Sequence, residues 1–290
     1  MPTAEELKAI VREQYGTIAH QSPADNAASC CGAGPVSNKV YSIMMDDYTP
    51  TAGYAPEADL GLGCGLPVEH ALLKPGMTVL DLGSGAGNDC FVARHEVGAE
   101  GKVIGVDFTT AMLEKARANA EARGYNNVEF RAGDIDDLPV TSGSVDAVIS
   151  NCVLNLVPNK ERVFAEMFRV LKPGGHFSVS DIVLVGELPD ALRNAAELYA
   201  GCVSGAIQRG AYLAGLEAAG FESVTVQKTK PILLPDDVLE RYLDAEGIAA
   251  FAARQTGIFS VTVFGQKPAG AQREAVAQEV QGCGPGSSCC

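Results

Sequence analysis

Between about residues 78 and 266, short apolar runs alternate with longer runs of helical character. We expect strands at residues 78–81, 102–107, 128–131, 145–151, 176–183, 221–227 and 259–266. We expect helices at residues 89–96, 110–123, 161–170 and 190–202. Strands that alternate with helices form βαβ units, and the resulting parallel sheet is covered by helices on both faces. The sequence therefore predicts an α/β fold around one mostly parallel sheet.

The chain of 290 residues divides into three predicted parts. Residues 1–65 contain an amphipathic helix and a Ser/Ala/Gly-rich loop around Cys30 and Cys31. Residues 66–267 contain the alternating strands and helices. Residues 268–290 form a Gly-rich segment with further cysteines, which we expect to be flexible.

Charge and hydropathy narrow the classes of partner. The chain has 22 Lys and Arg against 36 Asp and Glu, a net charge of −14. A surface this acidic repels nucleic acid and anionic membranes, so neither is an expected partner. No apolar run reaches the ~18 residues of a membrane span, and the first residues lack the apolar core of a signal peptide. We expect a cytoplasmic protein.

A glycine-rich turn follows the first expected strand. Gly83, Gly85 and Gly87 allow a sharp turn and a close approach of backbone to a ligand. A dinucleotide would favour G-x-G-x-x-G, whereas the spacing here is G-x-G-x-G, and Asp89 near the helix start would repel a diphosphate. Asp81 suits an ammonium group. The pattern favours a methionine-type cofactor, with a dinucleotide or a purely structural turn as alternatives.

Polar residues also end the next two expected strands. Asp107 could accept hydrogen bonds from both hydroxyls of a ribose. Asp134 and Ile135 form a polar–apolar pair suited to the edge and the face of an adenine. Ligands of open α/β sheets bind at the carboxyl ends of strands, so we expect these side chains in one site.

Four segments resemble the successive motifs of class I S-adenosylmethionine methyltransferases: residues 81–89, 107, 133–135 and 170–175. The resemblance implies a Rossmann-like, seven-stranded, mostly parallel sheet with a final antiparallel strand. It also implies S-adenosyl-L-methionine as cofactor. Asp81 would contact the methionine amino group, Asp107 the ribose and Ile135 the adenine, with the glycines beneath the cofactor and Asn151 beside it.

Nine cysteines, an odd number, argue against a structural disulfide framework. Cys152 follows the strand ending at Asn151, Cys64 precedes the first expected strand, and Cys202 ends a predicted helix. These three thiols could converge over the cofactor. The alternative is that each is a small buried hydrophobic residue, which we favour for Cys90. The spacing lacks the C-x₂₋₄-C pairs typical of structural zinc sites.

The cysteine contexts carry a closer resemblance, to the arsenite methyltransferase family. It involves residues 15–16, the Cys30-Cys31 neighbourhood, and residues 53–67, 150–156 and 199–205. The resemblance implies that Cys64, Cys152 and Cys202 hold As(III), delivered as a thiol complex. It further implies that Cys30 or Cys31 pairs with Cys64 in a redox step, which thioredoxin or glutathione resets.

Chemistry agrees with this interpretation, because soft thiolates are good ligands for soft ions. Three sulfur ligands leave the arsenic lone pair free to attack a methyl group in line, so positioning is needed but no base is required. Two alternatives remain: a methyltransferase of a small quinone- or sterol-like molecule, and a thiol-rich arsenic-binding protein without turnover. Tyr48 is a candidate lid residue, and the sequence assigns no role to Cys283, Cys289 and Cys290.

Overall fold

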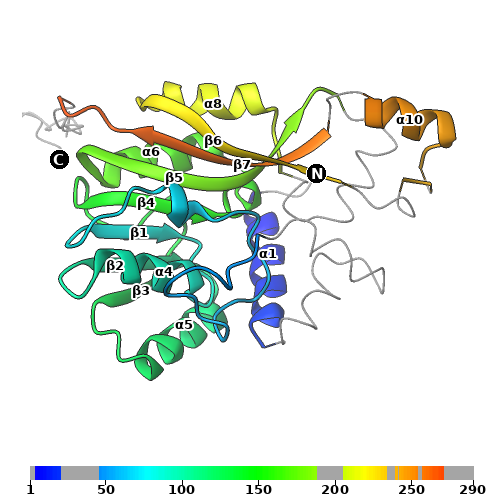
Figure 1. Cartoon of the computed structure of the whole chain (residues 1–290). Coiled ribbons are helices and arrows are strands. Elements are labelled where there is room, and N and C mark those ends of the chain that lie inside the picture. Colours follow the sequence, from blue (N-terminus) through cyan, green and yellow to red (C-terminus); the bar gives the residue numbers. More distant parts are fainter. Residues whose placement is uncertain are drawn as a thin grey trace, which may run out of the picture.

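Seven strands form one sheet in the computed structural model (Figure 1), which describes residues 4–20, 46–187, 205–233, 239–240, 242–253 and 257–270. The strands are β1 (Thr78–Leu82), β2 (Lys102–Asp107), β3 (Val128–Ala132), β4 (Val145–Asn151), β5 (Leu171–Val185), β6 (Glu222–Ile232) and β7 (Gly257–Gln266). Their order is β3-β2-β1-β4-β5-β7-β6. Strands β1 to β5 pair in parallel, and β7 runs antiparallel to both β5 and β6. The predicted mostly parallel, seven-stranded sheet with a final antiparallel strand is confirmed.

Helices cover both faces of this sheet. They are α1 (Ala4–Ala19), α4 (Asn88–Val97), α5 (Thr110–Ala122), α6 (Lys160–Val170), α8 (Arg209–Ala218) and α10 (Ala245–Ala253), with short 3₁₀ turns η1 (Pro67–His70) and η2 (Leu154–Leu156). Successive strand residues point to opposite faces, so Val79 packs in the core with α4 and α5, and Leu80 in the core with α6 and α8. Two apolar cores therefore enclose the sheet.

Two strands, β5 and β6, have bounds that differ from the sequence-based expectations. Strand β5 begins at Leu171 because it pairs there with Val145, before an irregularity that moves the next pair to Ala147 and His176. Strand β6 continues to Ile232, since an edge strand tolerates Pro231.

Helix α8 escaped the sequence analysis because its glycines have low helix propensity. It is anchored by buried Tyr212 and Leu216, one turn apart. A Cβ at Gly215 would lie 2.9 Å from the ring of Phe164, so glycine permits the close packing of α8 on α6. Helix α10 was not predicted either, and the helix expected at 190–202 lies outside the described residues.

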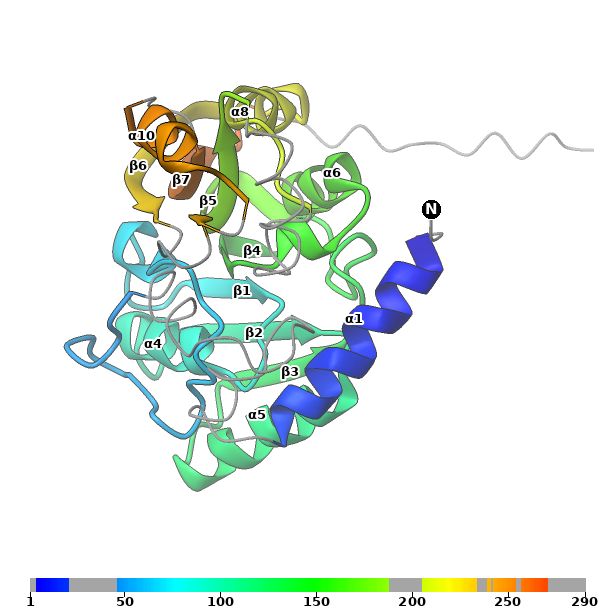
Figure 2. The same cartoon turned by 90° about the vertical axis from the view of Figure 1, so that its right-hand side faces the viewer.

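Helix α1 lies beside the carboxyl ends of β1, β2 and β3 (Figure 2). Lys8 Nζ is 3.0 Å from Asp136 Oδ2, and the Arg12 guanidinium lies 5.2 Å from the ring centre of Phe108. Lys115 donates to the carbonyl of Ala19 at the other end of the helix. The predicted N-terminal helix therefore closes the edge of the sheet where strand ends are exposed. No helix in the described ranges is both long enough and apolar enough to cross a membrane.

Phe177 offers a test of the core between β5 and α6. Its ring is fully buried and lies 4.7 Å from the ring of Phe221, edge to face. We expect Phe177→Ala to lower the free energy of unfolding by about 3–5 kcal/mol, because it leaves a cavity in a close-packed core. Leu233→Ala is the control, since Leu233 is 70% exposed and its loss should change stability by less than about 0.5 kcal/mol. Urea denaturation followed by circular dichroism measures both, and equal losses would contradict the described packing.

Candidate functional site

A pocket opens at the carboxyl ends of β1, β2 and β4, under α1. Its walls come from α1, the loop before β1, the glycine turn, the segment after β3 and the segment after β4. The pocket-lining residues used below are Lys8, Tyr48, Gly83, Gly85, Asp81, Asp89, Asp107, Asp134, Ile135, Asn151 and Cys152. Seven of the eight sequence-predicted cofactor residues line it; Gly87 instead begins α4 and packs against Phe91 and Phe130.

The glycine turn shapes the floor of this pocket. Gly83 has φ of +69°, and a Cβ there would lie 2.5 Å from the methyl groups of Val153. Gly85 has φ of +50°, and its N–H donates to Asp107 Oδ2 at 3.0 Å. Side chains are disfavoured at such φ values, so the turn can take this course only with glycine. The turn and the end of β2 are thereby joined.

Asp81 is a buried carboxyl group that forms no ion pair with a described residue. It is 2% exposed, and Cys90 Sγ donates to its Oδ2 at 3.2 Å. Burial, and then the charge of Asp89, raise the pKa of Asp81 well above its usual value. No Lys, Arg or His in the described part of the chain forms an ion pair with it. A buried carboxylate is costly without a positive partner, so the site fits the ammonium group expected from the sequence.

Two further carboxyl groups bracket the space beyond Asp81. Asp107 is 8% exposed, and the N–H of Thr109 donates to its Oδ1 at 2.8 Å. Asp134 lies 3.6 Å from Lys8 Nζ, and Ile135 beside it is buried. This combination of an acceptor held by backbone N–H groups and an apolar surface fits a ribose and an adenine. The sequence could not have indicated Lys8, because its partners lie more than a hundred residues away.

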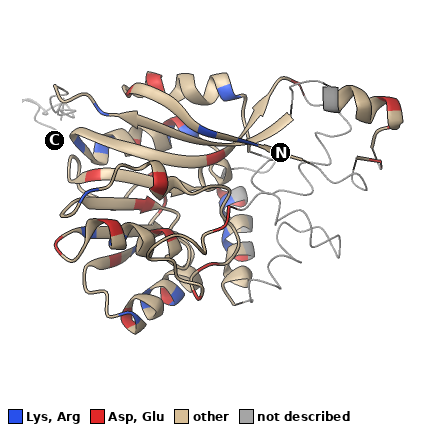
Figure 3. Ribbon diagram, in the orientation of Figure 1, with Lys and Arg blue, Asp and Glu red and all other residues tan. Residues whose placement is uncertain are grey.

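The pocket is strongly acidic. Lys8 is the only lysine or arginine among its described lining residues, against six aspartates: Asp59, Asp81, Asp89, Asp107, Asp134 and Asp136. Figure 3 shows acidic residues in red on the loops beside α1. Such a field favours a cationic ligand and disfavours a diphosphate. This argues against the dinucleotide alternative.

Asp89 is held between two hydrogen-bond donors. Tyr48 Oη donates to its Oδ1 at 2.6 Å, and Asn151 Nδ2 donates to its Oδ2 at 3.1 Å. Burial raises the pKa of Asp89 to about 6 despite these two bonds. Tyr48 is buried and lines the pocket; the expectation that it belongs to a lid stays a prediction.

Two of the three expected arsenic ligands lie together. Cys64 and Cys152 are buried in one apolar cluster with Ile182, Ile232 and Ile258. Cys152 also lines the pocket and has φ of +60°, a left-handed conformation that directs its side chain away from the course of β4. The apolar cluster and the pocket wall thus meet at Cys152, and Cys64 lies in the same cluster. Cys202, Cys30, Cys31, Cys283, Cys289 and Cys290 lie outside the described residues.

Cys90 lies in α4 and is fully buried in the core, as expected, but it also donates to Asp81. Its contact with a pocket carboxylate was not foreseen.

Asp181 and Tyr212 are neighbours of the thiols that the sequence analysis missed. Asp181 is fully buried in β5, accepts from the N–H of Ile182 at 2.9 Å and lies 3.5 Å from Tyr212 Oη. Burial raises the pKa of Asp181 to about 7. After burial, the charges of Asp181, Cys64 and Cys152 raise the pKa of Tyr212 well above its usual value. Asp181 lies in the carboxyl half of an expected strand, a signal like the one that identified Asp107.

The chain is similar to known methyltransferases. The family model described as a methyltransferase domain matches residues 73–233, more than half of the chain. An arsenite methyltransferase of Halobacterium salinarum is 45% identical over 77% of this chain and 59% of its own length. An arsenite methyltransferase of Aquipseudomonas alcaligenes is 37% identical over 80% of this chain and 67% of its own length. The chain thus spans less than two thirds of the first relative.

A solved structure agrees with these relatives. The arsenic(III) S-adenosylmethionine methyltransferase of Chlamydomonas reinhardtii matches with a TM-score of 0.61 and 33% identity, over 80% of this chain and 74% of that one. The domain match at residues 73–233 includes β1, β2 and β4, whose carboxyl ends carry the pocket. The chain therefore belongs to the arsenite methyltransferase family of class I S-adenosylmethionine methyltransferases.

Proposed function

We propose that this protein transfers methyl groups from S-adenosylmethionine to trivalent arsenic held by cysteine thiolates, giving methylated arsenicals in arsenic detoxification. The observation that carries the proposal is the shared buried cluster of Cys64 and Cys152, which come from distant segments. That cluster adjoins a pocket lined by Asp81 and Asp107. One cavity can therefore serve a cationic methyl donor and a thiophilic acceptor.

Four residues would hold the cofactor. Asp81 would bind its amino group, Asp107 its ribose hydroxyls, and Asp134 and Ile135 its adenine. When bound, S-adenosylmethionine supplies a methyl group on a positively charged sulfur. The acidic pocket attracts that charge, and the buried glycine turn brings backbone close to the ligand.

The thiols would hold the acceptor. Cys64 and Cys152 supply two sulfur ligands, and we propose Cys202 as the third. As(III) bound to three thiolates keeps its lone pair, so the nucleophile needs no proton removed and the site needs no general base. The contribution of Cys64 and Cys152 is then to fix the arsenic in line with the methyl group, an effect of positioning.

Methylation raises the formal oxidation state of arsenic by two. We propose that Cys64 and either Cys30 or Cys31 return these two electrons to arsenic when their thiols are oxidised to a disulfide. Thioredoxin or glutathione then reduces the disulfide. This cycle suits the cytoplasm, where such reductants keep thiols reduced.

We also propose that the chain divides into three parts. Residues 1–65 carry the redox thiols, residues 66–267 form the catalytic domain, and residues 268–290 form a flexible tail.

The thiol assignment can be tested with arsenite and labelled S-adenosylmethionine. We expect the wild-type protein to form labelled mono- and dimethylated arsenic. Cys64→Ser, Cys152→Ser and Cys202→Ser should each lower the rate by at least about 100-fold, because small losses of positioning cost that much. Binding of S-adenosylhomocysteine should be retained in all three variants.

Cys90→Ala is the matched control, since Cys90 is buried beside the other end of the pocket and contacts Asp81. It should leave arsenite binding unchanged. Labelled methyl transfer to a quinone-type acceptor that survives all the cysteine substitutions would refute the arsenic assignment. Tight arsenite binding without transfer would indicate a binding protein.

The cofactor assignment predicts a pH dependence. The pKa of Asp81 is raised by burial and by Asp89, and that of Asp89 is raised to about 6 by burial. An ammonium ligand favours the ionised carboxylates, so binding releases protons below these pKa values. The affinity for S-adenosylhomocysteine should therefore rise between pH 5 and pH 7 by up to about tenfold per pH unit for each proton released. Calorimetry in buffers of different ionisation enthalpy measures the release.

The ligand-free protein should show the opposite trend in stability. Carboxyl groups with raised pKa values in the folded state stabilise it at low pH. That stabilisation falls as the pH rises from the unfolded-state value of about 4 through about 6 for Asp89. An affinity independent of pH would contradict the assignment of Asp81 to the amino group.

A further inference from the structure

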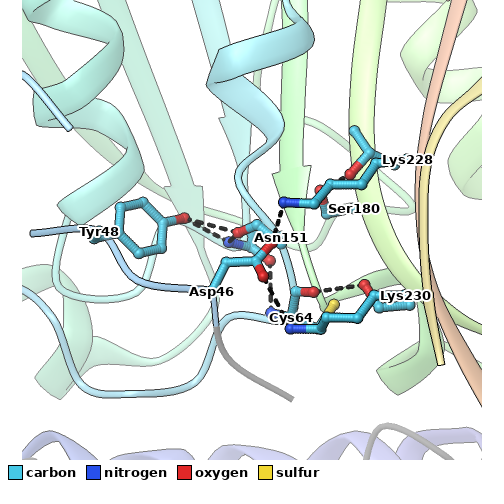
Figure 4. A network of polar contacts seen from close by, with 10 residues as sticks. Asp46, Tyr48, Cys64, Asn151, Ser180, Lys228 and Lys230 are labelled. Carbon is cyan, nitrogen blue, oxygen red and sulfur yellow. Dashed lines mark hydrogen bonds and ion pairs between the residues drawn. The ribbon is translucent and has the colours of Figure 1, made fainter. Parts of the chain in front are cut away.

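The side chain of Asn151 forms hydrogen bonds with the backbone of the loop that carries Cys64 (Figure 4). Its Oδ1 accepts the N–H of Cys64 at 3.0 Å, and its Nδ2 donates to the carbonyl of Gly65 at 2.8 Å. A backbone N–H can only donate and a carbonyl can only accept, so these two bonds fix the orientation of the amide. A Cβ at Gly63 would lie 2.7 Å from Nδ2, so the loop packs directly on the amide. One amide thus holds the backbone on both sides of the Cys64 side chain.

The same amide is joined to the other thiol by the chain itself. Cys152 directly follows Asn151, and its N–H donates to the carbonyl of Ser180 at 2.8 Å. Its left-handed φ of +60° is an uncommon conformation that the surrounding bonds must maintain. The position of Cys64 relative to Cys152 is therefore set through Asn151.

Tyr48 and Asp89 extend these contacts to the cofactor side of the pocket. Asn151 Nδ2 lies 2.7 Å from Tyr48 Oη and 3.1 Å from Asp89 Oδ2, and Tyr48 donates to Asp89 Oδ1 at 2.6 Å. Asp89 lies in the first turn of α4, directly after the glycine turn, and lines the pocket with Asp81. A ligand that orders this wall also orders the amide that holds Cys64.

Two ion pairs hold the segment that carries Tyr48 against β6, the edge strand of the sheet. Asp46 lies 2.8 Å from Lys228 Nζ and 2.9 Å from Lys230 Nζ, both on β6. Figure 4 shows these lysines reaching toward Asp46, next to the network around Asn151. Tyr48 itself stacks on Tyr54, with ring centres 6.1 Å apart. The hydroxyl of Tyr48 is thus delivered to the amide by a segment that is fixed from two directions.

We propose that Asn151 and Tyr48 are positioning residues, which hold Cys64 at the distance from Cys152 that As(III) requires. Through Asp89, the same two residues couple the binding of arsenic to the occupancy of the cofactor pocket. This inference rests on the proposed function and adds to it a link between the two binding events. A ligand that orders a shared element lowers the ordering cost for a second ligand. Because such coupling is reciprocal, cofactor and arsenite each raise the affinity for the other by the same factor.

Arsenite titrations of the full chain test the link, with and without S-adenosylhomocysteine, which cannot donate a methyl group. The ultraviolet absorbance of arsenic–sulfur bonds reports both the affinity and the number of sulfur ligands. We expect S-adenosylhomocysteine to lower the Kd of the wild-type protein for arsenite by at least about fivefold. Asn151→Ala should raise that Kd by about 10-fold to 100-fold and reduce the absorbance per bound arsenic, as expected when the support of a ligand is lost.

Tyr48→Phe separates coupling from folding. It removes one hydroxyl and keeps the ring, so arsenite should still bind while the enhancement by S-adenosylhomocysteine falls below about twofold.

Asn127→Ala is the matched control for Asn151→Ala. Asn127 also joins loop carbonyls, at 2.9 Å from Gly98 and 2.8 Å from Gly101, but it lies at the opposite end of the sheet. It should keep the wild-type enhancement.

The outcomes discriminate the two proposals. Wild-type arsenite affinity and absorbance in a folded Asn151→Ala variant would overturn the positioning role. If that variant does not fold, an undiminished enhancement in Tyr48→Phe overturns the coupling, and so does the absence of any enhancement in the wild-type protein. Methyl transfer to arsenite by the wild-type protein in a parallel assay with labelled S-adenosylmethionine would leave the proposed function intact. Failure of the wild-type protein to bind arsenite at all would refute the proposed function itself.

Discussion

The carboxyl ends of β1, β2 and β4 meet at one edge of the sheet, and the rest of the site depends on this constraint. Parallel pairing brings Asp81, Asp107 and Asn151 to neighbouring strand ends, although they are far apart in sequence. The same pairing concentrates negative charge where little water can reach it. Burial then raises the pKa values of Asp81, Asp89 and Asp107. The fold therefore creates a cavity whose buried carboxylates would be stabilised by a positively charged ligand.

The thiols occupy the boundary between this acidic cavity and an apolar cluster. Cys152 belongs to both, because it follows the last residue of β4 and turns there with a positive φ. Cys64 lies in a loop before β1, where its N–H donates to Asn151 Oδ1 and its carbonyl accepts from Ser260 Oγ. The thiol cluster and the acidic wall of the pocket are thus adjacent, and Cys152 is the residue that they share. Under the proposed function, this adjacency would bring two reactants of very different chemistry together.

The sequence predicted whatever depends on local periodicity and on strand ends. The seven strands, the helices α4, α5 and α6, and the residues at the ends of β1, β2 and β4 could be found because each has a signal in its own segment. Lys8, Tyr48 and the amide contacts of Asn151 with the Cys64 loop depend on tertiary packing, which no local pattern reports. Helices α8 and α10 are rich in small residues, and α8 depends on the two buried side chains of Tyr212 and Leu216. Asp181 was missed although its strand was predicted, because its importance comes from burial beside Tyr212.

Among the residues that the structure describes, strand β6 pairs only with β7 and forms one edge of the sheet. Exposed strand edges can recruit a strand from another molecule and so initiate aggregation. Lys228, Lys230 and Pro231 lie in succession along this edge, where like charges repel a second copy and proline withholds a backbone donor. The lysines that pair with Asp46 thus lie on an edge strand of eleven residues, and charged lysines and a proline on an edge strand are features that disfavour edge-to-edge association.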